Sequence, residues 1–316
     1  MIQIAGYILT LLYACNLFFP ALFRTIPSVI PALAGHAAFG IFALLLARGA
    51  RRTSNHFLYF LRLITAALST GLITILADRF AQVYFPEHNA LFTYATSIAL
   101  IAGLSMITGC SQDLVMQAMT ANDSKGFDPS EQKGNPPRDP SGKKTNLFGV
   151  PFQPLSYRMH PIVGIVVGIL TIGVTFFSTM FFRFSHGLYG QAFIVLAFIA
   201  FRDTPAPQGK PLTSVRLIAL RRRIANTLFE DTLAFRRALM SLSALTLVFL
   251  LLSKIPGSPT KLMTPQMTGC LFALPLALLL PEFKEPPSPT RRRITYSALA
   301  ICYAVLFAIR LLVEQR

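Results

Sequence analysis

Two side chains that could do chemistry lie inside long apolar segments of this sequence. Arg62 lies in segment 57–77, about one to two helical turns from its start, and His36 lies near the middle of segment 26–47. An ionisable residue within a membrane is costly and is therefore a functional candidate. Arg62 could hold an anionic headgroup or a phosphate, or its long side chain could reach back to the interface. His36 could serve as a ligand or handle a proton, or it could be a hydrogen-bonded packing residue between helices.

The thirteen Asp and Glu residues all lie outside the deep parts of the apolar segments. Ion-coupled transporters and proton pumps keep an ionisable group inside the helix bundle, so this pattern argues against that class. Asp203 is the one carboxylate that directly follows the short apolar segment 187–201, and it lies in an arginine-rich loop with Glu230 and Asp231. The predicted catalytic residues are therefore Asp203, Arg62 and His36.

The sequence predicts no metal ligand and no cofactor-binding residue, and it leaves the cofactor unknown. The four cysteines lie within or at the ends of apolar segments, without the spacing of a disulfide framework or a zinc site: Cys15, Cys110, Cys270 and Cys302. We interpret them as small packing residues. The remaining histidines lie at span ends or in loops, and no two share a helix at a spacing suited to haem: His56, His88, His160 and His186.

The elements that carry these residues are predicted to be membrane helices. Hydrophobic residues make up 53% of the chain and charged residues only 13%, against about 25% in soluble domains. The charges gather in a few loops between long uncharged stretches. The net charge of +16 follows from Lys and Arg in cytoplasmic loops, so we expect no nucleic-acid partner.

A span needs about 20 mostly apolar residues. We predict an all-α polytopic bundle of about nine spans, with a range of seven to nine. The clear candidates are 4–23, 26–47, 57–77, 89–109, 161–182, 238–253 and 294–313, and the two short ones are 187–201 and 264–281. Gly164 and Gly168 form a G-x-x-x-G pair, which lets a neighbouring backbone approach closely.

The basic residues predict the orientation. With the N-terminus inside and the C-terminus outside, the inside loops hold 21 Lys and Arg residues and the outside set holds 7. Every inside loop is richer in them than its outside neighbours, as expected for cytoplasmic loops.

The predicted organisation alternates spans and two long cytoplasmic loops. Residues 1–110 hold four spans, 161–201 two and 238–316 three. Loop 111–160 is expected to be partly disordered, because segment 122–145 is rich in Pro, Gly, Ser and charge. Within loop 202–237, segment 213–237 favours an interfacial helix, although it could also extend the next span into the cytoplasm. Its arginines would contact lipid headgroups: Arg216, Arg222 and Arg223.

A bundle of nine spans with the N-terminus inside and the C-terminus outside resembles the membrane topology of the UbiA-type intramembrane prenyltransferases. That family holds magnesium and a diphosphate with two aspartate-rich cytoplasmic loops. Here the loop after the sixth span offers only Asp203 in Phe-Arg-Asp-Thr, and loop 48–55 has no acid. The resemblance therefore extends to topology and not to the chemistry, because a hard cation needs carboxylates.

Three functions remain open from the sequence. The first is a membrane-embedded enzyme that acts on a lipid or isoprenoid-like substrate near the cytoplasmic face. The second is a non-catalytic membrane subunit or assembly factor, which would have another membrane subunit as partner. The third is a transporter or channel without carboxylate coupling inside the membrane. Membrane lipids are the expected partners in each, and the sequence does not indicate which membrane.

Overall fold

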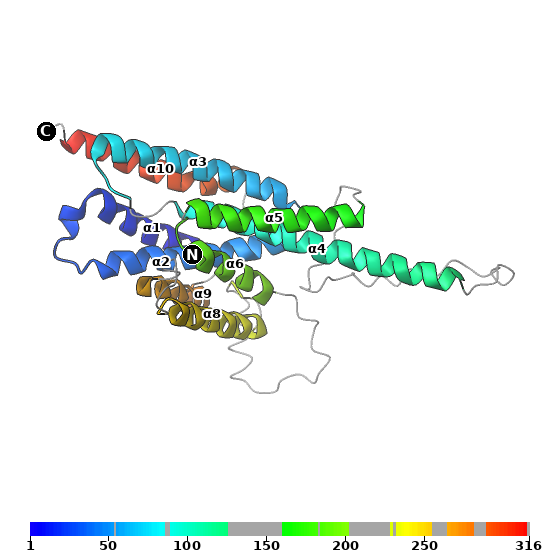
Figure 1. Ribbon diagram of the computed structural model, residues 1–316. Helices are drawn as coiled ribbons and strands as arrows, with labels where there is room; N and C mark the ends of the chain where they lie inside the picture. Colours follow the sequence, from blue (N-terminus) through cyan, green and yellow to red (C-terminus); the bar gives the residue numbers. More distant parts are fainter. Residues whose placement is uncertain are drawn as a thin grey trace, which may run out of the picture.

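The computed structural model describes residues 1–53, 55–85, 89–125, 160–182, 184–201, 228–229, 232–254, 264–280 and 289–314. Within these ranges the chain is all-α, with nine α-helices and two 3₁₀ helices (Figure 1). The elements are α1 (Ile2–Phe18), η1 (Pro20–Phe23), α2 (Val29–Arg52), α3 (His56–Ala81), α4 (Ala90–Lys125), α5 (Pro161–Phe182), α6 (Gly187–Ala200), α8 (Thr232–Leu252), η2 (Pro265–Phe272), α9 (Ala273–Leu279) and α10 (Pro289–Glu314).

This is an integral, multi-pass membrane protein. Five helices are long and apolar enough to cross a bilayer: α2, α3, the part of α4 up to Val115, α5, and α8 from Leu233. Four further apolar stretches are shorter: α1, α6, η2 with α9, and residues 297–313 of α10. The 22 residues of α5 give a length of about 33 Å, which is enough for the hydrocarbon core of a bilayer.

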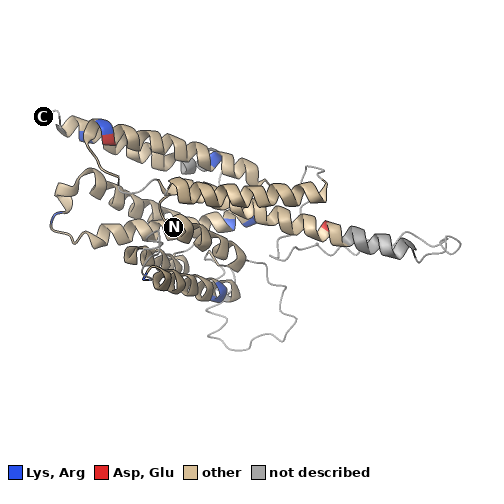
Figure 2. Cartoon of the chain, viewed as in Figure 1, with Lys and Arg blue, Asp and Glu red and all other residues tan. Residues whose placement is uncertain are grey.

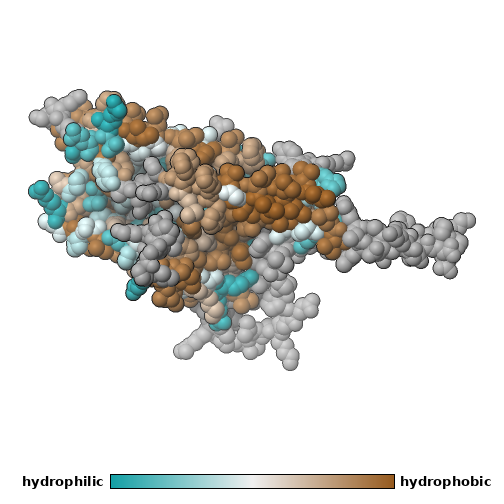
Figure 3. Space-filling model, in the orientation of Figure 1, coloured by the Kyte–Doolittle hydropathy of each residue, from teal (hydrophilic) through white to brown (hydrophobic). Residues whose placement is uncertain are grey.

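The outer surface of the bundle is apolar where lipid would contact it. Large side chains of α5 such as Leu170, Val174 and Phe177 are exposed. Figure 3 shows such apolar side chains over α5 and its neighbours, with hydrophilic ones gathered toward the ends. Most of the described Lys and Arg residues lie near the ends of helices, as Figure 2 shows. Water cannot solvate such an apolar surface, whereas lipid chains can.

Helix α2 is the central element of the bundle. It packs against α1, α4, α6, η2 and α9, and most of the residues in its second half are buried. The main hydrophobic core gathers around it, with Ile41 and Leu44 of α2 fully buried beside Phe193 and Ile194 of α6. A residue on α2 is therefore well placed to meet side chains from several other elements.

Helices α4 and α5 form a close pair, and α3 lies beside α10 (Figure 1). The predicted glycine pair is at the α4–α5 contact. A Cβ on Gly103 would lie 2.9 Å from the carbonyl oxygen of Gly168, and Gly164 leaves room for the thiol of Cys110. The G-x-x-x-G motif thus allows the two backbones to approach, as predicted.

Two helices extend beyond the predicted spans. Helix α4 continues to Lys125, past the predicted span end at residue 109, and α8 begins at Thr232, so that it includes Arg236 and Arg237. Apolar content marks where a helix can enter lipid but not where its backbone stops being helical. The predicted interfacial helix 213–237 lies mainly outside the described residues. Leu228, one of the few described residues of this segment, is fully buried in the main core.

The last short span is two elements instead of one. Residues 265–272 form a 3₁₀ helix and residues 273–279 an α-helix. Pro275 lies in the first turn of α9, where its missing N–H has no helical partner to lose. The tighter 3₁₀ turn matters for the site, because it repeats every three residues.

Candidate metal centre

His36 is placed by the first part of α2. It lies seven residues after Val29, or about 10 Å along the helix axis. Phe39 follows three residues later and therefore lies on the same face of the helix. Gly40 follows by one turn, and a Cβ there would collide with the carbonyl oxygen of Cys270. The glycine therefore lets η2 pack directly onto α2 beside His36.

His186 is placed by the turn that precedes α6. Its φ of 64° is in the left-handed region, and the following Gly187 has φ 42°. Such a conformation is uncommon for a residue other than glycine and is often found at functional sites. Gly190 lies one turn into α6, and a Cβ on it would be 2.7 Å from the Cβ of His186 and 3.0 Å from Phe39. The turn and this glycine bring the imidazole back against α2.

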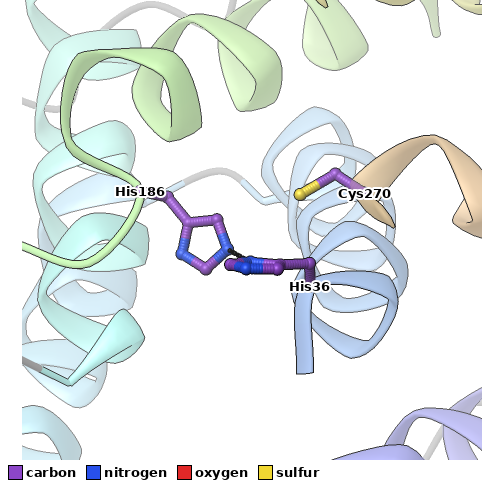
Figure 4. A group of neighbouring side chains, drawn as sticks. All are labelled: His36, His186 and Cys270. Atoms are coloured by element: carbon purple, nitrogen blue, oxygen red, sulfur yellow. Dashed lines mark hydrogen bonds between the residues drawn. The ribbon is translucent and has the colours of Figure 1, made fainter. Parts of the chain in front are cut away.

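Cys270 is placed by η2. The preceding Gly269 faces α2, and a Cβ on it would lie 3.1 Å from the Cβ of His36. Cys270 itself is fully buried in the main core. Figure 4 shows its sulfur pointing from the 3₁₀ helix toward the pair of imidazoles. A glycine therefore accompanies each of the three residues and allows close approach of the backbones that carry them.

The three side chains form a compact group. His36 Nδ1 and His186 Nε2 are 2.9 Å apart in a hydrogen bond (Figure 4). One ligand atom from each of His36, His186 and Cys270 can be chosen so that all lie within 4.8 Å of one another. His186 is 6% exposed, and His36 is half-buried. Two nitrogens and one sulfur thus converge inside the apolar bundle.

Surrounding residues fix the orientation of His186. Its Nδ1 is 2.8 Å from the hydroxyl of Ser185, and its ring stacks on Phe39 with centroids 3.7 Å apart. Thr93 of α4 donates a hydrogen bond to the carbonyl of Ser185. The Tyr94 hydroxyl donates to the carbonyl of Phe39 over 3.0 Å. A histidine ligand is usually held in this way, with its second nitrogen bonded to an outer partner.

Cys270 also has a polar neighbour. The Tyr189 side chain forms a hydrogen bond with that of Cys270, and its hydroxyl is 3.0 Å from the Thr246 hydroxyl of α8. Tyr189 is fully buried. The thiol is therefore held in a polar microenvironment, in which a hydroxyl can donate a hydrogen bond to a sulfur that carries negative charge.

The surroundings of His186 favour its uncharged form. The side chain is buried in the apolar interior and directly contacts a second imidazole, so a charged ring would be neither solvated nor paired. A neutral imidazole keeps a lone pair, which is what a metal ion needs. The direct contact between the two rings leaves no room between them for a macrocycle, so the pair does not fit bis-histidine haem.

The structure brings one of the predicted catalytic residues into this group. His36 is part of it. Arg62 is exposed on α3, six residues after His56. Asp203 and the headgroup candidates lie outside the described residues: Arg216, Arg222 and Arg223.

Sequence reasoning missed His186 and Cys270. His186 was assigned to a loop and Cys270 to packing, and 84 residues separate them. No local motif joins residues that come from a helix, a turn and a 3₁₀ helix. The one available signal was that His36, a polar residue in an apolar segment, needs a polar partner.

Comparison of the chain with protein-family models, with curated proteins and with solved structures finds no match. The function of the chain is therefore inferred from the geometry of His36, His186 and Cys270.

Proposed function

We propose that this chain is a copper(I)-binding membrane protein, with His36, His186 and Cys270 as the ligands. The observation that supports this proposal is the convergence of two imidazole nitrogens and one thiol within 4.8 Å in the protein interior. Soft sulfur ligands with imidazole suit copper(I), whereas hard cations such as Mg²⁺ and Ca²⁺ prefer oxygen.

Charge favours copper(I) over zinc(II) at this place. One thiolate and two neutral imidazoles carry a single negative charge, and the group of described ligands contains no carboxylate. Copper(I) would leave the site neutral, whereas a divalent ion would leave a net positive charge. An uncompensated charge in an apolar interior is unfavourable, so the monovalent ion is the better fit.

Copper(I) binding would replace the hydrogen bond between the two histidines by two bonds from their nitrogens to copper. The Cys270 thiol loses its proton as the Cu–S bond forms, so one proton is released for each copper(I) taken up. The hydrogen bond between the two rings needs a proton on one of the two facing nitrogens. With His186 protonated on Nδ1, beside the Ser185 hydroxyl, that shared proton belongs to His36 Nδ1, and it must move to His36 Nε2 so that both facing nitrogens can coordinate. The two nitrogens move apart from 2.9 Å, since ligands of one ion are about 3.4 Å apart at tetrahedral angles.

The orientation predicted from the basic residues implies which face of the membrane lies nearer to this site. With nine spans and the N-terminus inside, α2 would begin at the outer surface and the site would lie in the outer half of the bilayer. A closed site of protein ligands in that position suits a protein that holds or passes on copper. This is the assembly-factor alternative among the functions expected from the sequence. The enzyme on a lipid or isoprenoid-like substrate stays a prediction, because Asp203 lies outside the described residues.

Competition against a chromogenic copper(I) chelator tests the proposal, with the full chain purified in detergent under reducing conditions. We expect one copper(I) per chain. Cys270→Ser should weaken binding by more than the roughly 10- to 100-fold that loss of an outer hydrogen-bonding partner costs. Cys302→Ser is the matched control, since Cys302 lies half-buried in a second, separate core cluster.

Wild-type protein that takes no copper(I) from the chelator would overturn the proposal. So would a Cys270→Ser protein that binds as well as the wild type, or an equal loss in the Cys302→Ser control.

A further inference from the structure

Met267 lies on the same face of η2 as Cys270. The two residues are three positions apart in a 3₁₀ helix, where side chains at i and i+3 eclipse each other. Their Cα atoms are about 6 Å apart along the axis, at 2.0 Å per residue. A methionine side chain can span that distance, since it has three rotatable bonds.

Met267 is also buried in the same core cluster as Cys270. It is 6% exposed. The Cβ of Gly269, between them, would point at His36 and Leu33, which places this turn of η2 beside the histidine. A 3₁₀ helix turns by about 120° per residue, so Met267 and Cys270 project together to a side that Gly269 does not occupy.

We infer that Met267 supplies a thioether to the same metal ion and makes the site selective for copper(I) over zinc(II). This inference rests on the proposed function. A thioether is a soft, neutral ligand that favours copper(I), and it adds no charge to a site that one thiolate has already neutralised. Sulfur from Met267 would complete an N₂S₂ set with the imidazoles of His36 and His186 and the thiolate of Cys270.

The test is the substitution Met267→Leu, which nearly conserves volume and removes only the sulfur. Met240→Leu is the control, because Met240 is 72% exposed on α8 and belongs to the lipid-facing surface. Copper(I) and zinc(II) affinities are measured for both variants and for the wild type by chelator competition. We expect Met267→Leu to weaken copper(I) binding about 10-fold and to leave zinc(II) affinity unchanged.

Each outcome decides a different point. Unchanged copper(I) affinity in Met267→Leu, with binding still lost in Cys270→Ser, would overturn this inference and leave the proposed function intact. An equal loss for both metals would assign Met267 a packing role only and would also overturn it. If the wild type fails to bind copper(I), the proposed function itself fails.

Discussion

At the residue scale, the molecule combines one residue that stands out in the sequence with two that do not. His36 was identifiable because a polar ring in an apolar helix needs a partner. Its partner His186 follows a helix end, and only the left-handed φ of 64° turns its ring back toward α2. Cys270 resembles any small packing residue until the fold places it beside the imidazoles. Sequence therefore singled out one of the three residues, as a candidate catalytic residue and not as a metal ligand, and the fold brought the other two beside it.

Ser185 is predicted to be a positioning residue for His186. Replacing it by alanine removes the 2.8 Å contact to Nδ1, which helps to hold the imidazole ring in its orientation. We expect Ser185→Ala to lower copper(I) affinity by about 10- to 100-fold, without loss of folded protein. Chelator competition measures the affinity, and size-exclusion chromatography the folded fraction.

The comparison for that variant is Ser69→Ala, since Ser69 is exposed on α3 and bonds only its own helix, at the carbonyl of Thr65. Equal affinities in the two variants would show that Ser185 does not orient the ligand.

At the element scale, the long apolar helices could be predicted and the packing that assembles the site could not. A run of apolar residues predicts a span, because backbone groups in lipid must bond within their own helix. The same run does not separate a 3₁₀ helix from an α-helix, so η2 was missed. Nor does it show which glycines face another backbone. Gly40 and Gly269 do, and their close contacts set the distance between α2 and η2.

Gly40→Ala should separate α2 from η2. The added methyl group would collide with the carbonyl oxygen of Cys270 and lie 2.8 Å from the Cβ of Ala273. Overpacking of this kind costs about 1 to 3 kcal/mol of stability. We expect a lower melting temperature in detergent by circular dichroism, together with weaker copper(I) binding.

Gly173→Ala on α5 provides the matched control, because no heavy atom lies within 4 Å of a Cβ there. Alanine at this position should be neutral or should stabilise the helix by up to about 1 kcal/mol. A Gly40→Ala protein as stable as Gly173→Ala would show that the α2–η2 contact is looser than described.

At the scale of the whole molecule, the separation of long apolar segments from charged loops explains the architecture. Apolar side chains cover α5 and the lipid-facing sides of α3 and α8, while the main core gathers around α2. The membrane class was predictable because it depends only on the lengths of uncharged segments. The side of the membrane that each end faces depends on loop charges and stays a prediction.

The predicted orientation can be tested with single cysteines in intact cells. In a chain where Cys15, Cys110 and Cys302 are replaced by serine, Lys143→Cys and Arg222→Cys should both be protected from a membrane-impermeant maleimide. Arg24→Cys and Lys254→Cys should react, because they belong to the predicted outer set. Labelling of only one of the first pair would contradict the proposed orientation.

The most direct test of the metal site is copper K-edge X-ray absorption on the wild-type chain loaded with one copper(I). We predict an edge characteristic of copper(I) and a first shell of two imidazole nitrogens with at least one sulfur. Cys270→Ser should lose sulfur scattering from that shell. A wild-type spectrum with only nitrogen and oxygen neighbours, or one unchanged by Cys270→Ser, would contradict the assignment of His36, His186 and Cys270 as a metal centre.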